Sequence, residues 1–69
     1  MIAQYEACIL TEDLPQHRLR AGARGVVVEI TSSGRTCIVE FFAPDGETIA
    51  VTFVEPGQLR PAPETMPAG

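Results

Sequence analysis

The chain has 69 residues, a length that suits one small domain near the lower limit at which an apolar core suffices. Apolar residues make up 45% of it, which argues against intrinsic disorder, and a net charge of −4 without any lysine disfavours binding to nucleic acid or anionic lipid. No apolar run reaches the roughly 18 residues of a membrane span, and the first residues lack a secretory signal. We therefore expect a cytoplasmic protein that does not use the membrane.

Five short strand-like segments follow one another along the chain. The first, residues 5–10, precedes a polar connection of residues 11–22 in which Pro15 forbids a continuous strand. The later segments cover residues 24–30, 35–42 and 47–54 and a very short stretch around Leu59. Short strands at this spacing, with turn signals and no helical pattern, predict an all-β small barrel or sandwich. We place this domain at residues 1–62 and expect a flexible, proline-rich tail at 63–69.

Two turn signals predict the register of the sheet, because turn type fixes which residues pair. The stretch "APDGE", 43–47, suits a three-residue loop closed by Gly46 in the left-handed conformation, and "SG", 33–34, suits a two-residue turn. The first turn pairs Phe41 with Ile49, Val39 with Val51, Cys37 with Phe53 and, on the other face, Phe42 with Thr48. The second pairs Ile30 with Cys37, Val28 with Val39 and Val26 with Phe41.

Both registers turn the same residues of the third segment inward. The predicted core consists of Val26, Val28, Ile30, Cys37, Val39, Phe41, Ile49, Val51, Phe53 and Leu59, closed by part of the first segment. The predicted outward face carries Val27, Ile38, Phe42 and Ala50, with Val54 at its margin. It also carries Glu29 and Glu40, as the cost of burying charge requires.

Two glycines stand where the long connection enters the second segment. Gly22 and Gly25 suit a backbone that turns sharply or approaches another strand closely. A phosphate-cradling role is disfavoured, because no helix follows whose N-terminus could hold an anion.

Four stretches in combination resemble a known family. They are "ILTEDLP", "GARGVVVEI", "VEFFAPDGETIAV" and "QLRPA". Over residues 5–62 the chain resembles the bacterial family catalogued as domain of unknown function 4926. The resemblance implies an SH3-like small barrel of about five antiparallel strands and no catalytic site. Over residues 19–41 the chain is more weakly similar to the KOW motif of ribosomal and transcription-factor domains and to the nitrile hydratase β-type barrel.

The residues that carry most chemistry are few and scattered. Cys8, His17 and Cys37 lie far apart and form no metal-ligand motif, and one histidine with two strand cysteines is a poor nucleophile–base set. We expect free thiols in the core and a solvated His17. The adjacent Glu12 and Asp13 suit a loop or cap pair. We therefore predict no metal, no cofactor and no enzyme activity.

The outward face suggests binding instead. Ile38 and Phe42 would be apolar anchors, and Arg18, Arg20 and Arg24 a polar rim that selects acidic partners. This predicts a non-catalytic protein-interaction module, a small accessory or neutralising subunit that docks onto another protein, such as a neighbouring-gene product. Small barrels also leave edge strands that accept a partner strand or a second copy, so a homodimer is a further possibility.

Two alternatives stay open. The outward apolar residues could be scattered surface residues, or the 11–22 connection could cover them. The three arginines could instead bind RNA or DNA in the manner of a KOW module, although the net charge disfavours nucleic acid.

Overall fold

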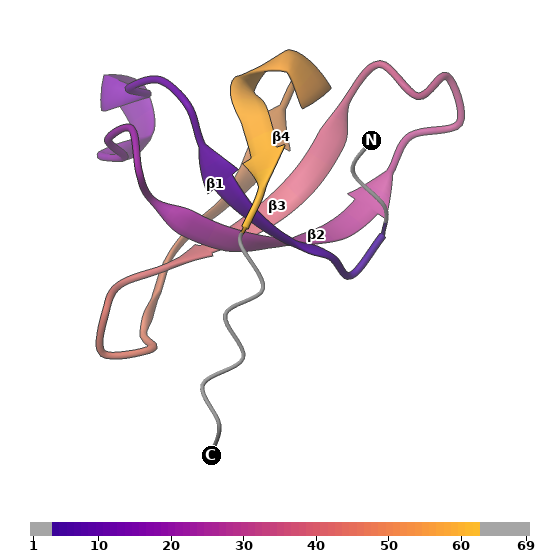
Figure 1. The fold of residues 1–69 in the computed structure, drawn as a ribbon. Helices are drawn as coiled ribbons and strands as arrows, with labels where there is room; N and C mark the ends of the chain where they lie inside the picture. Colours follow the sequence, from indigo (N-terminus) through magenta and orange to yellow (C-terminus); the bar gives the residue numbers. More distant parts are fainter. Residues whose placement is uncertain (1–3, 63–69) are drawn as a thin grey trace.

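The computed structural model describes residues 4–62, and the predicted tail at 63–69 lies outside the described residues. The strands are β1 (Ala7–Leu10), β2 (Arg24–Ile30), β3 (Cys37–Phe42), β4 (Thr48–Val54) and β5 (Leu59–Pro61), with short 3-10 helices η1 (Pro15–His17) and η2 (Pro56–Gln58). They form one antiparallel sheet in the order β4-β3-β2-β1-β5 (Figure 1). The predicted all-β fold with five antiparallel strands is therefore confirmed. Within residues 4–62 no pairing joins β4 to β5, so the sheet has two edges.

The β3–β4 turn forms as predicted, but the register changes one residue beyond it. Gly46 has a φ of 92°, and the backbone N–H of Ala43 donates to the Glu47 carbonyl across the three-residue loop. Phe42 pairs with Thr48 as predicted, but Phe41 pairs with Ala50 rather than Ile49.

Ile49 is thus the extra residue of a β-bulge, and the bulge exchanges the two faces of β4. Ala50 packs against the core and Val54 is buried, whereas three residues predicted to be in the core are exposed. The exposed fractions are 44% for Ile49, 58% for Val51 and 63% for Phe53. The core prediction for β4 is therefore wrong.

The β2–β3 hairpin repeats this behaviour. Ile30 pairs with Cys37 as predicted, although the loop spans four residues, 32–35, rather than two. A bulge at Val28 then shifts the register, and Val27 pairs with Val39 and is fully buried. The prediction that Val26 and Val28 face the core, and Val27 solvent, is wrong. A β-bulge increases the local twist of a sheet, and a small, strongly curved sheet requires such twist.

The core gathers residues from every strand and from the 11–22 connection. Its buried members are Cys8, Leu10, Leu14, Leu19, Val27, Cys37, Val39, Phe41, Val54 and Leu59, with Ala23, Ile30 and Ala50 packed against them. The predicted inward residues of β3, together with Ile30 and Leu59, are confirmed. The two leucines of the connection hold it in place, because Leu14 and Leu19 exchange backbone hydrogen bonds of 2.9 and 3.1 Å.

Gly22, before β2, and Gly25, within it, have the two roles predicted for them. Gly22 has a φ of 97°, in the left-handed region that favours glycine. At Gly25 an added Cβ would lie only 2.8 Å from the Glu40 carbonyl oxygen, so β2 approaches β3 too closely for a side chain there.

Candidate interaction surface

The two predicted anchors lie on the outer face of β3, opposite the core. The Ile38 and Phe42 side chains alternate with the buried Cys37, Val39 and Phe41 along β3, and both are half-buried. The 11–22 connection contributes Leu14 and Leu19 to the core on the other face.

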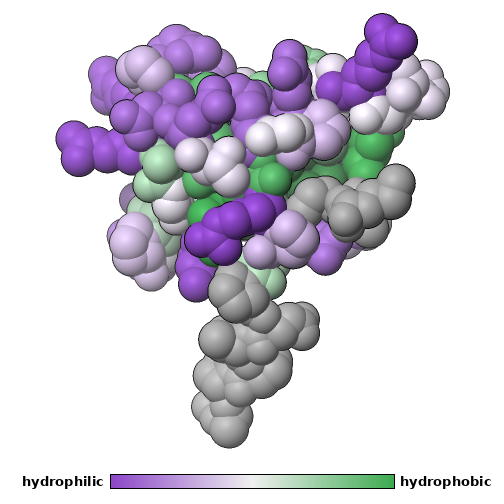
Figure 2. Space-filling model, turned by 45° about the horizontal axis from the view of Figure 1, so that its top comes forward, coloured by the Kyte–Doolittle hydropathy of each residue, from purple (hydrophilic) through white to green (hydrophobic). Residues whose placement is uncertain are grey.

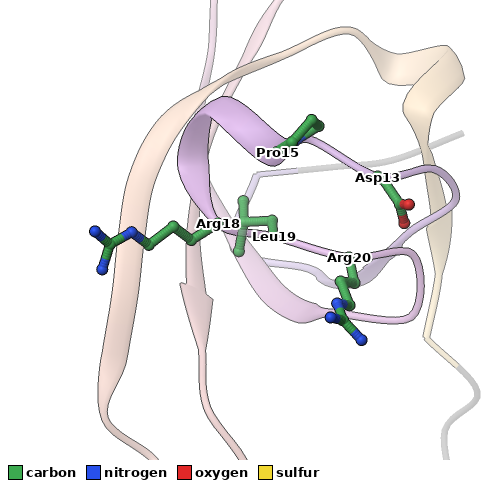
Figure 3. Close-up of a pocket in the computed structure, with 5 residues that line it drawn as sticks. All are labelled: Asp13, Pro15, Arg18, Leu19 and Arg20. Atoms are coloured by element: carbon green, nitrogen blue, oxygen red, sulfur yellow. The ribbon is translucent and has the colours of Figure 1, made fainter.

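The predicted arginines do not share one location. Arg24 is exposed and pairs with Phe42, so it lies on the outer face. Arg18 and Arg20 belong to the 11–22 connection, at the end of the molecule that Figure 2 shows to be mainly hydrophilic. Together with Asp13, Pro15 and Leu19 they line a hollow of about 350 Å³. In Figure 3 the Arg18 and Arg20 side chains point in different directions.

Side-chain hydrogen bonds hold the chain in place around the hollow. Asp13 Oδ1 accepts a hydrogen bond of 2.9 Å from the backbone N–H of Ala21 and so holds the connection closed. The neighbouring His17 is half-buried, and its Nε2 forms a hydrogen bond of 3.0 Å with Thr52 Oγ1 of β4. The expectation of a solvated His17 is therefore wrong. Among the described residues, no group of three or more His, Cys, Asp or Glu side chains could hold a metal ion.

The two cysteines are buried free thiols, as predicted. Burial, with smaller contributions from Cys37 and Glu6, raises the pKa of the Cys8 thiol from its ordinary value of 9.0 to about 11. Burial also raises the pKa of Cys37. The thiolate is the reactive form of cysteine, so these side chains stay protonated near neutral pH and pack as small apolar groups.

The surface that the sequence prediction missed lies on β4. We call it the β4 surface and define it as Ile49, Val51 and Phe53 of β4 with Ile38 of β3. Phe53 pairs with Ile38, so the apolar area continues from the edge strand onto its neighbour. The stretch "TIAVTFV" contains no charged residue and no proline, and this absence was the signal available in the sequence.

Acidic residues surround the β4 surface. Glu47 and Glu55 directly precede and follow β4, and both are exposed. Glu29 is exposed on the outer face beside Ile38, and the half-buried Glu40 accepts a hydrogen bond of 2.7 Å from the Thr48 hydroxyl. The edge strand β4 is thus apolar and has glutamates at both of its ends and on β2 and β3.

The comparisons with known proteins identify a family for nearly the whole domain. The family model described as Domain of unknown function (DUF4926) matches residues 5–61. Comparison with the curated proteins and with the solved structures gave no match. No helix within the described part of the chain has the length and apolar character needed to cross a membrane.

Proposed function

This chain belongs to the DUF4926 family, whose description assigns no activity, and we propose that it is a non-catalytic interaction module that docks onto another protein. The observation that carries the proposal is the β4 surface, an edge strand with three large, exposed apolar side chains. Single exposed apolar residues are ordinary, but an apolar and uncharged edge strand is a feature that soluble proteins usually avoid.

A bound partner would bury the apolar side chains of β4 that are exposed to solvent in the isolated chain. Val51 is 58% and Phe53 63% exposed, so burying the remaining area would stabilise a complex by about 1–2 kcal/mol each before the costs of association. Ile38 lies beside Phe53 and extends the contact onto β3. Phe42 and Arg24 lie together on the same outer face and supply a mixed apolar and polar margin.

The partner that we expect is a cytoplasmic protein encoded by a neighbouring gene, for which this chain serves as an accessory or neutralising subunit. Affinity capture from the native host tests this with wild-type protein and Phe53→Asp. Tyr5→Asp is the matched control, because Tyr5 is an aromatic residue with 72% exposure that precedes β1. We expect wild type and Tyr5→Asp to retain the same partner and Phe53→Asp to lose it. Equal capture by all three proteins would rule out the β4 surface as the docking site.

Nucleic-acid binding is the second candidate function. In its favour, Arg24 and Arg60 both lie opposite Ile9, so two exposed arginines flank one position of β1. Phosphate binding would strengthen at low salt and weaken steeply with added salt. If RNA binds in this way and Arg20→Glu with Arg24→Glu abolishes binding, the protein-docking proposal is replaced.

We further propose that the sheet curls into a partly open SH3-like barrel. In support, both edge strands contribute buried residues to one core, Val54 from β4 and Leu59 from β5, and two bulges supply curvature. Nuclear Overhauser contacts between the methyl groups of Val54 and those of Leu59 or Leu10 would support this closure. Their absence in a folded sample would leave an open curved sheet.

A further inference from the structure

We infer that the occupant of the β4 surface is an extended segment of the partner protein that joins the sheet beside β4 as a sixth strand. This segment carries apolar side chains at alternate positions and a lysine or arginine at each end. The inference rests on the proposed function and specifies its binding mode and the chemistry of the partner.

The backbone of the sheet edge can accept another strand. Among residues 4–62, β4 is the last strand in the sheet order and pairs only with β3. In an antiparallel pair, alternate residues direct their N–H and C=O groups away from the partner strand, so a seven-residue edge presents a row of such groups. Prolines and charged side chains usually block such edges, and "TIAVTFV" has neither.

The apolar side chains of β4 gather on one face of the strand. Val51 and Phe53 lie two residues apart and both pair with outer-face residues of β3, so their side chains lie on one face. An added strand with alternating apolar side chains would extend that face. The contact from η1 reaches β4 on the other face, because Thr52, the hydrogen-bond partner of His17, pairs with the buried Val39. The outer side of the edge is therefore the exposed apolar side, and cross-strand apolar pairs stabilise such an addition.

The charges at the two ends of β4 favour a basic partner strand over a second copy of this chain. Glu47 and Glu55 are exposed and each lies four residues from Val51. Antiparallel self-pairing that aligns the apolar side chains about Val51 would place Glu47 opposite Glu55 of the second copy at both ends. Like charges directly opposite destabilise a strand pair, whereas a cation at each end of an incoming strand would be favoured.

Peptide titration of the isotope-labelled, full-length protein tests the inference. The probe is a synthetic peptide of about nine residues in which valine and isoleucine alternate with threonine between two terminal lysines. The first matched peptide has glutamates in place of the lysines. The second is N-methylated at alternate residues, which removes the main-chain donors that strand addition needs.

We expect amide shift changes concentrated in Thr48–Val54. The lysine peptide should bind at least about tenfold more tightly than the glutamate peptide at low salt, with a smaller ratio at high salt because exposed charges are screened. The N-methylated peptide should not bind. Phe53→Asp should weaken binding of the lysine peptide.

A double variant that neutralises both flanking glutamates tests the role of charge. Glu47→Gln combined with Glu55→Gln should remove the preference for lysine and leave the apolar contact in place. Glutamine retains a side-chain oxygen, which matters because the Glu55 side chain caps η2.

The outcomes separate this inference from the proposed function. No shift changes in β4, or equal affinity for the lysine and glutamate peptides, overturns the basic strand. Concentration-dependent shifts in β4 without peptide, with a doubled mass in solution, identify a second copy as the occupant and also overturn it. If host capture depends on Phe53 while the peptides leave β4 unchanged, the interaction module stands and strand addition is wrong. If host capture does not depend on Phe53, the proposed function fails whatever the peptides do.

Discussion

Replacement of Gly25 by alanine is expected to destabilise the fold more than a similar change at Gly22 or Gly57. A Cβ at position 25 would lie 2.8 Å from the Glu40 carbonyl oxygen and 2.8 Å from Val39 Cγ1. Ordinary van der Waals contact begins near 3.4 Å. The oxygen belongs to the backbone of β3, which pairs with β2, and the Val39 side chain is fully buried, so neither neighbour can move aside cheaply.

The magnitude follows from the cost of overpacking, about 1–3 kcal/mol, and the backbone clash places Gly25→Ala at about 3 kcal/mol. A domain of this length has a total stability of about 3–10 kcal/mol, so the loss is a large part of it. Gly22→Ala meets no atom within 4 Å but has a φ of 97°, which costs about 1–2 kcal/mol. Gly57→Ala meets open space without that strain and should be neutral or stabilising by up to about 1 kcal/mol.

Urea denaturation followed by far-ultraviolet circular dichroism measures the free energy of unfolding of the three variants. The expected order of stability is Gly57→Ala at or above wild type, then Gly22→Ala, then Gly25→Ala. If Gly25→Ala lies within about 0.5 kcal/mol of Gly57→Ala, the close approach of β2 to β3 is wrong, whatever the value for Gly22→Ala.

Three further predictions concern the core, the thiols and the connection. Val54→Ala should lower the free energy of unfolding by about 1.5–3 kcal/mol, because Val54 is buried. Val51→Ala is the same change on the exposed face of the same strand and should lower it by less than about 0.5 kcal/mol. Equal losses in urea denaturation would contradict the bulge and support the register without it. Because burial raises the pKa of Cys8 from 9.0 to about 11, the unfolded chain loses the thiol proton first. The stability present below pH 9 should therefore decline towards pH 11 by roughly 3 kcal/mol at most. Denaturation of Cys8→Ala across this range should lack that part of the decline, and a decline identical to that of wild type would contradict it. Asp13→Ala removes the acceptor for the Ala21 N–H and should lower the free energy of unfolding by about 0.5–1.5 kcal/mol. It should also speed hydrogen exchange of the Ala21 amide. Unchanged exchange there would show that this hydrogen bond does not hold the connection closed.

Local turn chemistry made part of the fold predictable from the sequence. Gly46 closes a three-residue loop, and next to each turn the predicted pairs, Phe42 with Thr48 and Ile30 with Cys37, are present. The prediction failed beyond those pairs, because one extra residue in a strand exchanges its faces and no turn signal reports it. The composition of the 11–22 connection also predicted a polar loop. Its leucines are isolated in a polar stretch and gave no periodic signal, although Leu14 and Leu19 are buried.

The error at β4 bears on function. Without a bulge, β4 would direct its large side chains, among them Val51 and Phe53, into the core; with the bulge, it directs Ala50 and Thr52 inward. These smaller inward side chains suit an interior that Leu14 and Leu19 of the connection also occupy. One of them, Thr52, also forms the hydrogen bond with His17. Ile49, Val51 and Phe53 remain on the solvent side. Their exposed apolar surface does not stabilise the isolated chain, so stability alone does not explain these residues. Sequences often depart from the pattern that folding alone favours where they serve a function, and the exposed apolar side chains of β4 therefore support the proposed docking role.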